Sequence, residues 1–511
     1  MADAIDPVRV LDEAIAALNQ PDAILPAEAV ERALKVAPLD ARLWHVKGLI
    51  HRVYDRRELA IPALQRAASL APTEGIIAHG LARTMLEAGL PSVDAFALAA
   101  RLNGFNGDIL KGLAAALVAE GQSATAMEGL EKAVERSPVW VDGHSLLASL
   151  RWSHGERDGF ARSFDDALHE NPTNADLWLV LIVTLLNAER FDDALARIDA
   201  ARRAMGEHEV FDGHEVNARV ELGQVDEADR LFAKLAPLQL PNVELRRVRH
   251  ALRQGRLDVA LKTLDRWLSS DQQAGFWPYA ATAWRLANDT RSDWLEGDRR
   301  LVGVFDIGDR LPPMDELAGK LRAIHNLDGQ PLAQSVRGGT QTDGHLFQRI
   351  DPVIVSLREA TRRTIGEYVA QLPEADPAHP LLRSVPADIK FSGAWSVRLQ
   401  AGGHHSNHVH PMGWVSSALY IALPPDLGDD HSGWLTLGEP QAELALDLAP
   451  TRLVEPKSAR LALFPSWMWH GTRPFGSGER LTVAFDVTSP GQRPRQQQNP
   501  PLRRLAHAKR T

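Results

Sequence analysis

The sequence predicts a multidomain α + β chain, in which an N-terminal α-solenoid of helix hairpins precedes a C-terminal jelly roll. Two observations predict this order. Helical segments break at a nearly constant interval through the first three hundred residues, and short apolar runs separated by turns begin near Ile389. Helices followed by strands indicate separate domains rather than alternating βαβ units. A chain of 511 residues is also too long for one hydrophobic core.

Composition limits the classes of function. The chain has 57 basic and 66 acidic side chains, and its net charge of -9 argues against a nucleic acid or an anionic membrane as the main partner. It has no cysteine, so a metal must be held by nitrogen and oxygen ligands. Acidic residues near the start, and the lack of an apolar run of roughly 18 residues, predict a cytoplasmic protein without a membrane span.

The helical breaks recur with spacings of 34 or 32 residues. They fall at Asp55, Gly89, Gly121, Gly155, Glu189, Gly223, Gly255 and Asp289. Small residues that let a second helix lie close to the first follow five positions later, at Ala60, Ala126, Ala194, Ala228 and Ala260, whereas Phe160 departs from this pattern. Prolines that end one helix and can open the next recur at Pro38, Pro72, Pro138 and Pro172. Each unit is therefore a helix, a tight turn, another helix and a stop.

This pattern resembles the tetratricopeptide repeat, whose period is about 34 residues and whose helix pairs stack into a superhelix. The resemblance covers roughly residues 5–300, as eight or nine units. One helix hairpin cannot bury its own apolar face, so stacking supplies the core and leaves a concave groove. The array is expected to bind a protein or peptide. It could do so as a scaffold or dimerisation surface or through a peptide-binding groove, and the sequence does not decide between these two roles.

Four segments are expected along the chain. Residues 1–300 are the repeat array. Residues 301–380 connect it to the next domain and include a glycine-rich loop, SVRGGTQTDGHLF, and one amphipathic helix. Residues 381–490 are the β domain. Residues 491–511 carry six Arg or Lys and no acid, and are expected to form a basic, disordered tail.

The stretch HHSNHVHP, residues 404–411, holds four histidines. Residues i and i+2 of a strand share a face, so His408 and His410 can point at a common centre. His470 follows near the end of a later strand, in FPSWMWHGTRPF. The co-occurrence of these three imidazoles with a nearby arginine indicates a metal site. His404 and His405 lie in a glycine-led loop and are expected at the surface or the mouth of the site.

The strand RLTVAFDV supplies candidates for anion binding. Arg480 and Thr482 share one face of this strand, where a cation and a hydroxyl could grip a carboxylate. Ser416 and Tyr420 share one face of the run WVSSALYIAL. The turn at residues 411–413 leaves open whether this face is also that of the histidines.

The stretches NHVHPMGWVSSALYIALPP, LFPSWMWHGTRPF and ERLTVAFDV look like iron(II)- and 2-oxoglutarate-dependent oxygenases with a double-stranded β-helix, some bacterial members of which carry tetratricopeptide repeats. The resemblance implies iron(II), 2-oxoglutarate and O2. It puts His408 and His470 at the two histidine-ligand positions. It puts Arg480 where a basic residue pairs with the distal carboxylate of 2-oxoglutarate. Thr482 and Tyr420 would assist Arg480. Ser416 is also expected to be one of the cofactor-binding residues.

His410 departs from the family, because many of these oxygenases have Asp or Glu there to complete a 2-His-1-carboxylate triad. Either His410 is the third ligand, which we favour, or it lies outside a site completed by water. An acid could also come from Asp429, Asp430 or Glu439, although nothing in the sequence puts these residues at the site.

The predicted function is an iron(II)- and 2-oxoglutarate-dependent dioxygenase that hydroxylates a protein or peptide presented by the repeat array. One alternative is a non-catalytic repeat scaffold with a metal-binding or inactive β-helix domain. Another is a three-histidine dioxygenase without a cosubstrate, in which Arg480 would meet an anionic substrate.

Overall fold

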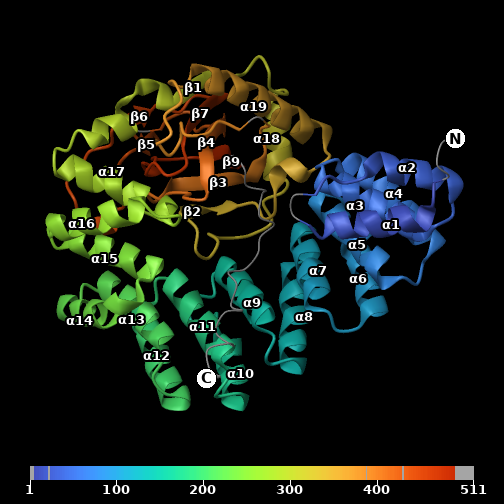
Figure 1. The fold of residues 1–511 in the computed structure, drawn as a ribbon, viewed down its shortest axis with the longest axis horizontal. Helices are drawn as coiled ribbons and strands as arrows, with labels where there is room; N and C mark the ends of the chain where they lie inside the picture. The colour runs from blue at the N-terminus through green and yellow to red at the C-terminus, as the bar shows by residue number, and fades with distance from the viewer. Residues whose placement is uncertain (1–4, 21–22, 387, 428–430, 489–511) are drawn as a thin grey trace. The chain divides into compact units, whose positions relative to one another are not determined.

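The structure is a computed structural model that describes residues 5–20, 23–386, 388–427 and 431–488. The predicted basic tail lies outside the described residues. The chain divides into two compact units (Figure 1): Met1–Ala133 with Asp343–Arg358, and Val134–Thr342 with Glu359–Thr511. The four segment boundaries that the sequence predicts stay predictions.

Helices α1 to α17 form the repeat array and pair as consecutive hairpins. The first eight are α1 (Pro7–Leu18), α2 (Ala27–Val36), α3 (Ala41–Val53), α4 (Arg57–Leu70), α5 (Gly75–Glu87), α6 (Val93–Asn103), α7 (Gly107–Ala119) and α8 (Ser123–Arg136). The remaining nine are α9 (Val141–Ser153), α10 (Arg162–Glu170), α11 (Ala175–Asn187), α12 (Phe191–Met205), α13 (Glu209–Glu221), α14 (Val225–Leu235), α15 (Pro241–Arg253), α16 (Leu257–Leu268) and α17 (Trp277–Leu286).

The repeat period has a backbone cause. Seven of the eight predicted breaks have positive φ, from 57° at Asp55 to 85° at Gly155, and each follows the first helix of a hairpin. A left-handed residue after the last helical turn ends a helix because it turns the chain away from the helix axis. The last break lies one residue earlier than predicted, at Asn288 with φ 51°.

Small residues recur inside five of the hairpins, and a tryptophan contacts a proline carbonyl at the start of two of them. The five predicted alanines lie in the second helices and are at most 1% exposed, which confirms that they permit close helix packing. The recurring prolines have partners that the sequence analysis did not identify. The Trp44 indole N–H donates to the Pro38 carbonyl at 2.9 Å, and Trp178 donates to Pro172 at 2.8 Å.

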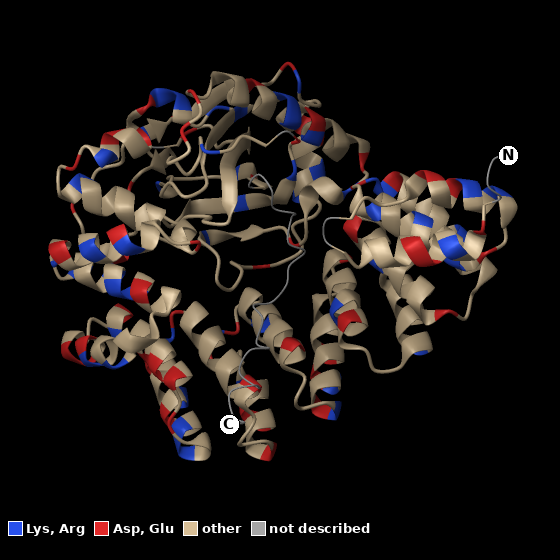
Figure 2. Ribbon diagram, viewed as in Figure 1, with Lys and Arg blue, Asp and Glu red and all other residues tan. Residues whose placement is uncertain are grey.

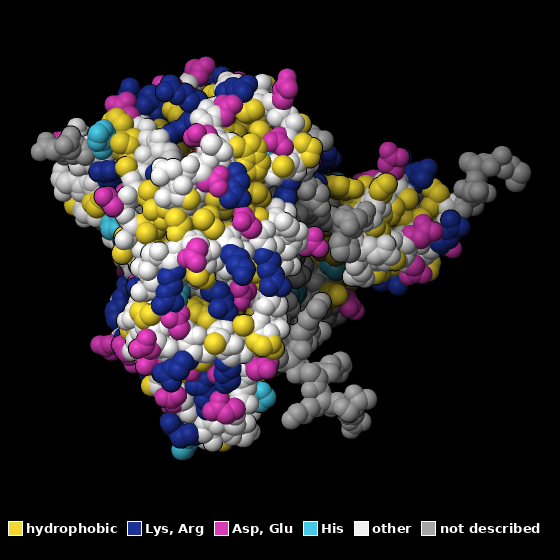
Figure 3. All heavy atoms as spheres, turned by 60° about the vertical axis from the view of Figure 1, so that its left-hand side comes forward, with side chains coloured by type: hydrophobic (Ala, Val, Ile, Leu, Met, Phe, Trp, Pro, Cys, Tyr) yellow, Lys and Arg dark blue, Asp and Glu magenta, His cyan; other side chains and the backbone are white. Residues whose placement is uncertain are grey.

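Charged residues of both signs are interspersed along the helices of the array, as Figure 2 shows. On the face drawn in Figure 3, Lys and Arg side chains stand beside Asp and Glu instead of forming a continuous basic surface. Many of these charges are paired, for example Arg249 with Glu221 at 2.7 Å.

The second unit contains two antiparallel sheets, called here the barrel, and two helices, α18 (Met314–Arg322) and α19 (Pro352–Gln371), the latter crossing the boundary between units. The larger sheet has the order β1-β7-β4-β9-β3-β2 and the smaller one β6-β5-β8. The strands are β1 (Gly303–Asp306), β2 (Val336–Gln341), β3 (Phe391–His405), β4 (Gly413–Ala422), β5 (Leu435–Leu437), β6 (Arg452–Val454), β7 (Arg460–Pro465), β8 (His470–Thr472) and β9 (Arg480–Thr488).

Two strands of the larger sheet come from the range predicted to connect the domains. Part of the expected glycine-rich loop forms β2, which pairs with β3. Gly338 has φ +69° at a register shift in this pairing, and a Cβ at Gly339 would overlap the Arg398 carbonyl oxygen. The glycines therefore allow a bulged edge strand to approach its neighbour closely, rather than making the segment a loop.

Helix α17 packs directly on the barrel, within the second unit. The Trp469 indole N–H lies 3.0 Å from the Pro278 carbonyl oxygen and 3.1 Å from Thr282 Oγ1. The ring of Trp469 meets that of Tyr279 edge-on, with centroids 5.5 Å apart. One apolar cluster includes residues of α15, α16 and α17 together with residues of both sheets. The last array helices and the barrel thus share a core.

The array of helix hairpins followed by antiparallel sheets of the double-stranded β-helix kind confirms the predicted fold class. No helix among the described residues is long and apolar enough to cross a membrane.

Candidate metal centre

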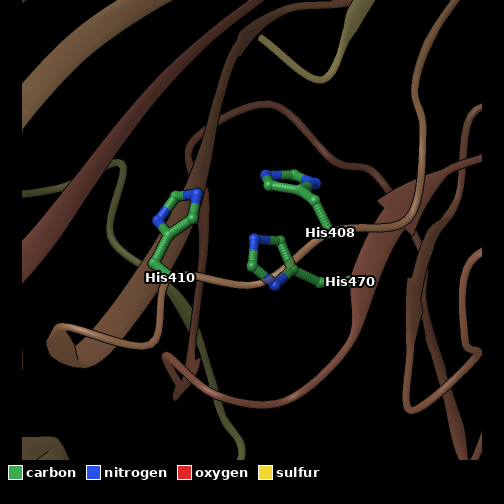
Figure 4. A group of neighbouring side chains, drawn as sticks. All are labelled: His408, His410 and His470. Atoms are coloured by element: carbon green, nitrogen blue, oxygen red, sulfur yellow. The ribbon is translucent and has the colours of Figure 1, made fainter. Parts of the chain in front are cut away.

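Three histidines from two chain segments converge in the barrel. The His408 N–H donates to the His470 carbonyl at 2.9 Å, and the His470 N–H donates back to the His408 carbonyl at 3.0 Å. This reciprocal pair brings the two ring centroids to 4.2 Å. The His410 N–H donates to Ser466 O at 2.8 Å. One nitrogen from each of the three rings lies within 4.8 Å of the others, and Figure 4 shows these nitrogens facing a shared space.

The predicted histidines therefore lie together, but strand alternation alone does not explain why. Strand β3 ends at His405, so His408 and His410 do not lie within a continuous strand. Their backbones pair instead with residues 466–470, and this pairing keeps both side chains directed at one space. We call His408, His410 and His470 the histidine triad.

Backbone carbonyls hold two of the rings. His408 Nδ1 lies 2.9 Å from the Ser406 carbonyl oxygen, and His470 Nδ1 lies 2.9 Å from the Met468 carbonyl oxygen. A carbonyl oxygen only accepts hydrogen bonds, so each Nδ1 carries the proton and each Nε2 keeps its lone pair. These are the tautomers that a metal bound through Nε2 requires.

The third ring is held by a carboxylate. His410 Nδ1 lies 2.7 Å from Asp486 Oδ2 and 2.9 Å from Oδ1. The Ser416 hydroxyl donates to Asp486 Oδ1 at 2.6 Å and also lies 3.0 Å from Ser466 Oγ. The carboxylate is thus fixed from two sides and faces the outer nitrogen of His410.

The surroundings of the triad favour neutral rings at two positions. Burial, together with the nearby His410, lowers the pKa of His408 to about 3. Burial and the neighbouring His408 lower the pKa of His470 well below its ordinary value. Burial also opposes charge on His410, but the charge and hydrogen bond of Asp486 outweigh it and raise the pKa of His410.

Arg480 is a buried cation that forms no ion pair with an acid in the described part of the chain. Its side chain is 1% exposed, and burial lowers its pKa. Its Nη1 donates to the Gly433 carbonyl at 2.8 Å, and the guanidinium lies 5.3 Å from the ring centre of Tyr420. Arg480 Nε and the Tyr420 hydroxyl are both buried, with no hydrogen-bond partner among the described residues. A buried charge or donor left unpaired costs free energy, so this arrangement suits an anion.

The candidate anion-binding residues share one face of the sheet. Across β4 and β9, Tyr420 pairs with Thr482 and Ser416 pairs with Asp486. This register answers the question left by the turn before β4, because Ser416 Oγ lies 3.4 Å from His410 Nδ1. Ser416 thus lies at the histidine end of β9, whereas Tyr420 lies at the Arg480 end.

Apolar side chains surround the Arg480 end of β9. On β3, Leu399 pairs with Arg480 and Val397 pairs with Thr482. Both apolar side chains are fully buried and form a cluster with Val336 of β2. A dry wall of this kind strengthens the attraction between the guanidinium and a carboxylate.

Asp486 is the site residue that the sequence analysis missed, although a signal was available. The alternation that puts Arg480 and Thr482 on one face of β9 continues through Ala484 to Asp486. Among the acids considered instead, Asp429 and Asp430 lie outside the described residues. Glu439 is not part of the metal-competent group, and the triad is the one such group found in the described part of the chain.

A network behind His408 fixes the loop that carries it. The Asn407 amide donates to the Pro440 carbonyl at 3.1 Å, and its Oδ1 accepts from Thr436 Oγ1 at 3.1 Å. Gly471 lies so close that a Cβ there would overlap Asn407 Oδ1. The loop before His408 and strand β8 are therefore locked together.

His404 and His405, expected at the surface or mouth, are both half-buried. His405 is the nearer to the triad, and its ring centroid lies 5.9 Å from that of His408. Ser335 Oγ lies 3.1 Å from His405 Nδ1 and 3.2 Å from His408 Nε2. Residues just before β2 thus line the triad.

Comparison with known proteins finds a family match in the repeat array and another in the barrel. Residues 393–486 match the family described as "Putative 2OG-Fe(II) oxygenase", and residues 161–212 match the tetratricopeptide repeat. No curated protein matches the sequence.

Several solved structures are similar to parts of the chain. YrrB, described as a TPR protein with an unusual peptide-binding site, is 22% identical, with 36% of this chain and 96% of that chain covered and a TM-score of 0.26. A prolyl-4-hydroxylase from Pseudomonas putida is 17% identical, with 40% and 98% covered and a TM-score of 0.26. The family matches confirm the two resemblances: the chain combines a tetratricopeptide repeat region with a C-terminal domain of the family described as "Putative 2OG-Fe(II) oxygenase".

Proposed function

We propose that the chain is an iron(II)- and 2-oxoglutarate-dependent dioxygenase that hydroxylates a protein or peptide presented by its repeat array. The observation that carries this proposal is the combination, on one barrel, of three convergent imidazoles with a buried arginine whose Nε has no partner among the described residues. Neither feature alone is specific, since histidine clusters and buried arginines also occur in structural roles.

The donor set fits iron(II). In the proposed centre His408, His410 and His470 bind the metal through Nε2, because the Nδ1 atoms face two carbonyl oxygens and a carboxylate. Imidazole nitrogens suit iron, and three of them leave positions open for a cosubstrate and O2. When bound, the iron supplies the oxidative chemistry that couples decarboxylation of 2-oxoglutarate to hydroxylation of the substrate.

The Arg480 end of the site fits the distal carboxylate of 2-oxoglutarate. Arg480 Nε and the Tyr420 hydroxyl offer two donors that are already buried, so they lose little solvation when the anion arrives. Thr482, opposite Tyr420 in the strand register, lies close enough in the sheet to assist. A charge-assisted hydrogen bond of this kind contributes roughly 1.5–3 kcal/mol.

The repeat array supports a macromolecular substrate. Tetratricopeptide-like arrays stack into curved surfaces suited to extended partners. The last array helices share a core with the barrel, so a peptide held by these helices would be retained close to the catalytic domain.

Anaerobic addition of iron(II) and 2-oxoglutarate tests the centre. We expect a visible metal-to-ligand charge-transfer band that is lost in His408→Ala and His470→Ala, with His404→Ala, a neighbouring half-buried histidine, as the control. Arg480→Gln should bind iron(II) normally but need about 10- to 100-fold more 2-oxoglutarate to develop the band, because it loses a charge-assisted contact. Arg398→Gln, a cation on the opposite face of the sheet, controls for lost charge.

The release of succinate measures turnover of 2-oxoglutarate. Release that requires iron(II), 2-oxoglutarate and O2, and that rises when cell extract is added, would support a hydroxylase with a macromolecular substrate. An iron-loaded protein without the band and without succinate release would contradict the proposal and favour a scaffold with a structural metal site.

A further inference from the structure

We propose that Asp486 is a positioning residue of the metal centre: through its hydrogen bond to His410 it supplies the negative charge that a directly bound carboxylate would otherwise bring. This inference rests on the proposed function, since it takes the histidine triad as the metal ligands. It assigns a role to a residue that touches only the outer side of one ligand.

The geometry defines what Asp486 can do. Both carboxylate oxygens lie within 2.9 Å of His410 Nδ1, and Ser416 donates to Oδ1 from the other side. The Asp486 side chain is 14% exposed, so solvent screens this interaction only weakly. The carboxylate therefore fixes the ring orientation and the tautomer of His410 together.

Charge balance gives the contact a further consequence. A triad of three neutral imidazoles leaves a divalent metal one charge more positive than a triad with a carboxylate. At this site the carboxylate of Asp486, held against the outer nitrogen of His410, restores that missing negative charge one ligand away from the metal. A ring that donates its N–H to a carboxylate is also a more basic ligand through its other nitrogen. The His410–Asp486 pair thus brings the negative charge and the ligand basicity that one acidic ligand would bring.

Substitution of Asp486 by Asn removes the charge but keeps the size and one acceptor oxygen. We expect Asp486→Asn to bind Co(II), used as a stable spectroscopic probe in place of iron, about 10- to 100-fold more weakly than the wild-type protein. Affinity is measured by competition with a chelator of known strength, and the visible Co(II) spectrum reports the ligand field. Asp306→Asn, a charge-matched change at an exposed, ion-paired position of the same sheet, should bind Co(II) like the wild-type protein.

Two further variants separate positioning from general structure. In a His410→Ala background, Asp486→Asn should weaken Co(II) binding by less than about a further 3-fold. The reason is that a residue that acts through His410 has no effect once that ring is removed. His410→Asp should bind Co(II) poorly, since the new carboxylate faces Asp486, and the double variant His410→Asp with Asp486→Asn should recover binding. That recovery would not occur if Asp486 only supported the fold.

The outcomes distinguish this inference from the function it rests on. Asp486→Asn that binds Co(II) as tightly as wild type, or that weakens binding equally in the His410→Ala background, overturns the role of Asp486 and leaves the proposed function intact. A wild-type protein that binds neither Co(II) nor iron(II) overturns both proposals. Metal binding that depends on Asp486 in a protein without any response to 2-oxoglutarate supports the positioning role and contradicts only the proposed reaction.

Discussion

Burial lowers the pKa of several histidines in this protein. His325 illustrates this outside the metal centre. Its Nδ1 lies 2.8 Å from Thr340 Oγ1 and its Nε2 lies 3.1 Å from Ser396 Oγ, so both nitrogens are engaged at the edge of the larger sheet. Burial, with the charge of Arg398 adding to it, lowers the pKa of His325 to about 4. The folded protein therefore holds His325 neutral where an unfolded chain would protonate it.

This difference predicts a pH-dependent stability. Between pH 6.5 and 4 the unfolded chain binds more protons at His325 than the folded protein does, so the free energy of unfolding falls as pH falls through this window. The loss between pH 7 and pH 5 should be about 2 kcal/mol from this residue. Other buried histidines titrate in the same window, so the test compares denaturant unfolding of wild type with His325→Gln. The variant should be less stable at pH 7 and lose about 2 kcal/mol less on acidification; an unchanged slope would contradict the prediction.

At the scale of elements, the centre depends on a close approach between strand β8 and the loop before His408. Two reciprocal backbone hydrogen bonds join His408 to His470, and Asn407 fills the space beside Gly471. Strand β8 contains only three residues. Its position is therefore set by the close contact with the loop before His408 rather than by a long strand pairing. Sequence alternation indicates which side chains share a face, whereas this contact decides where the two histidine segments meet.

A single added methyl group tests that contact. Gly471→Ala should push Asn407 away and cost about 1–3 kcal/mol in the free energy of unfolding through overpacking. Because Asn407 precedes His408, metal affinity should fall as well. Gly476→Ala is the matched control, since a Cβ there meets nothing within 4 Å. Calorimetry and Co(II) titration of both variants measure the two effects, and equal behaviour of the two would show that the close approach does not hold the centre.

At the scale of the whole molecule, the barrel shares part of its core with the last helices of the array. One apolar cluster runs from α15, α16 and α17 into both sheets, and Trp469 lies within it at 2% exposure. Trp469 immediately precedes His470, so the array helices that hold its indole also hold the backbone of a proposed ligand. Folding of the last repeats and assembly of the centre are thus coupled.

Removal of this side chain should affect both parts. Trp469→Ala is expected to cost about 3–5 kcal/mol in the free energy of unfolding, because it leaves a large cavity between α17 and the barrel. Helical circular dichroism and Co(II) loading, followed on heating, should both be lost at a lower temperature. Trp44→Ala, in the first repeats, is the control and should leave the Co(II)-dependent transition in place. Metal loading in Trp469→Ala at the wild-type temperature would argue against the coupling.

The sequence by itself determined the features of this protein that repeat over short distances along the chain. The breaks near every 34 residues come from helix-ending backbone conformations, and alternation along β9 puts Arg480 and Thr482 on one face. Only the tertiary structure decided which distant segments meet: β2 at the sheet edge, Trp469 on α17, and Asp486 against His410. The physical reason is range. Helix ends and strand faces depend on a few neighbouring residues, whereas contacts between residues 76 or 191 positions apart depend on how whole elements pack.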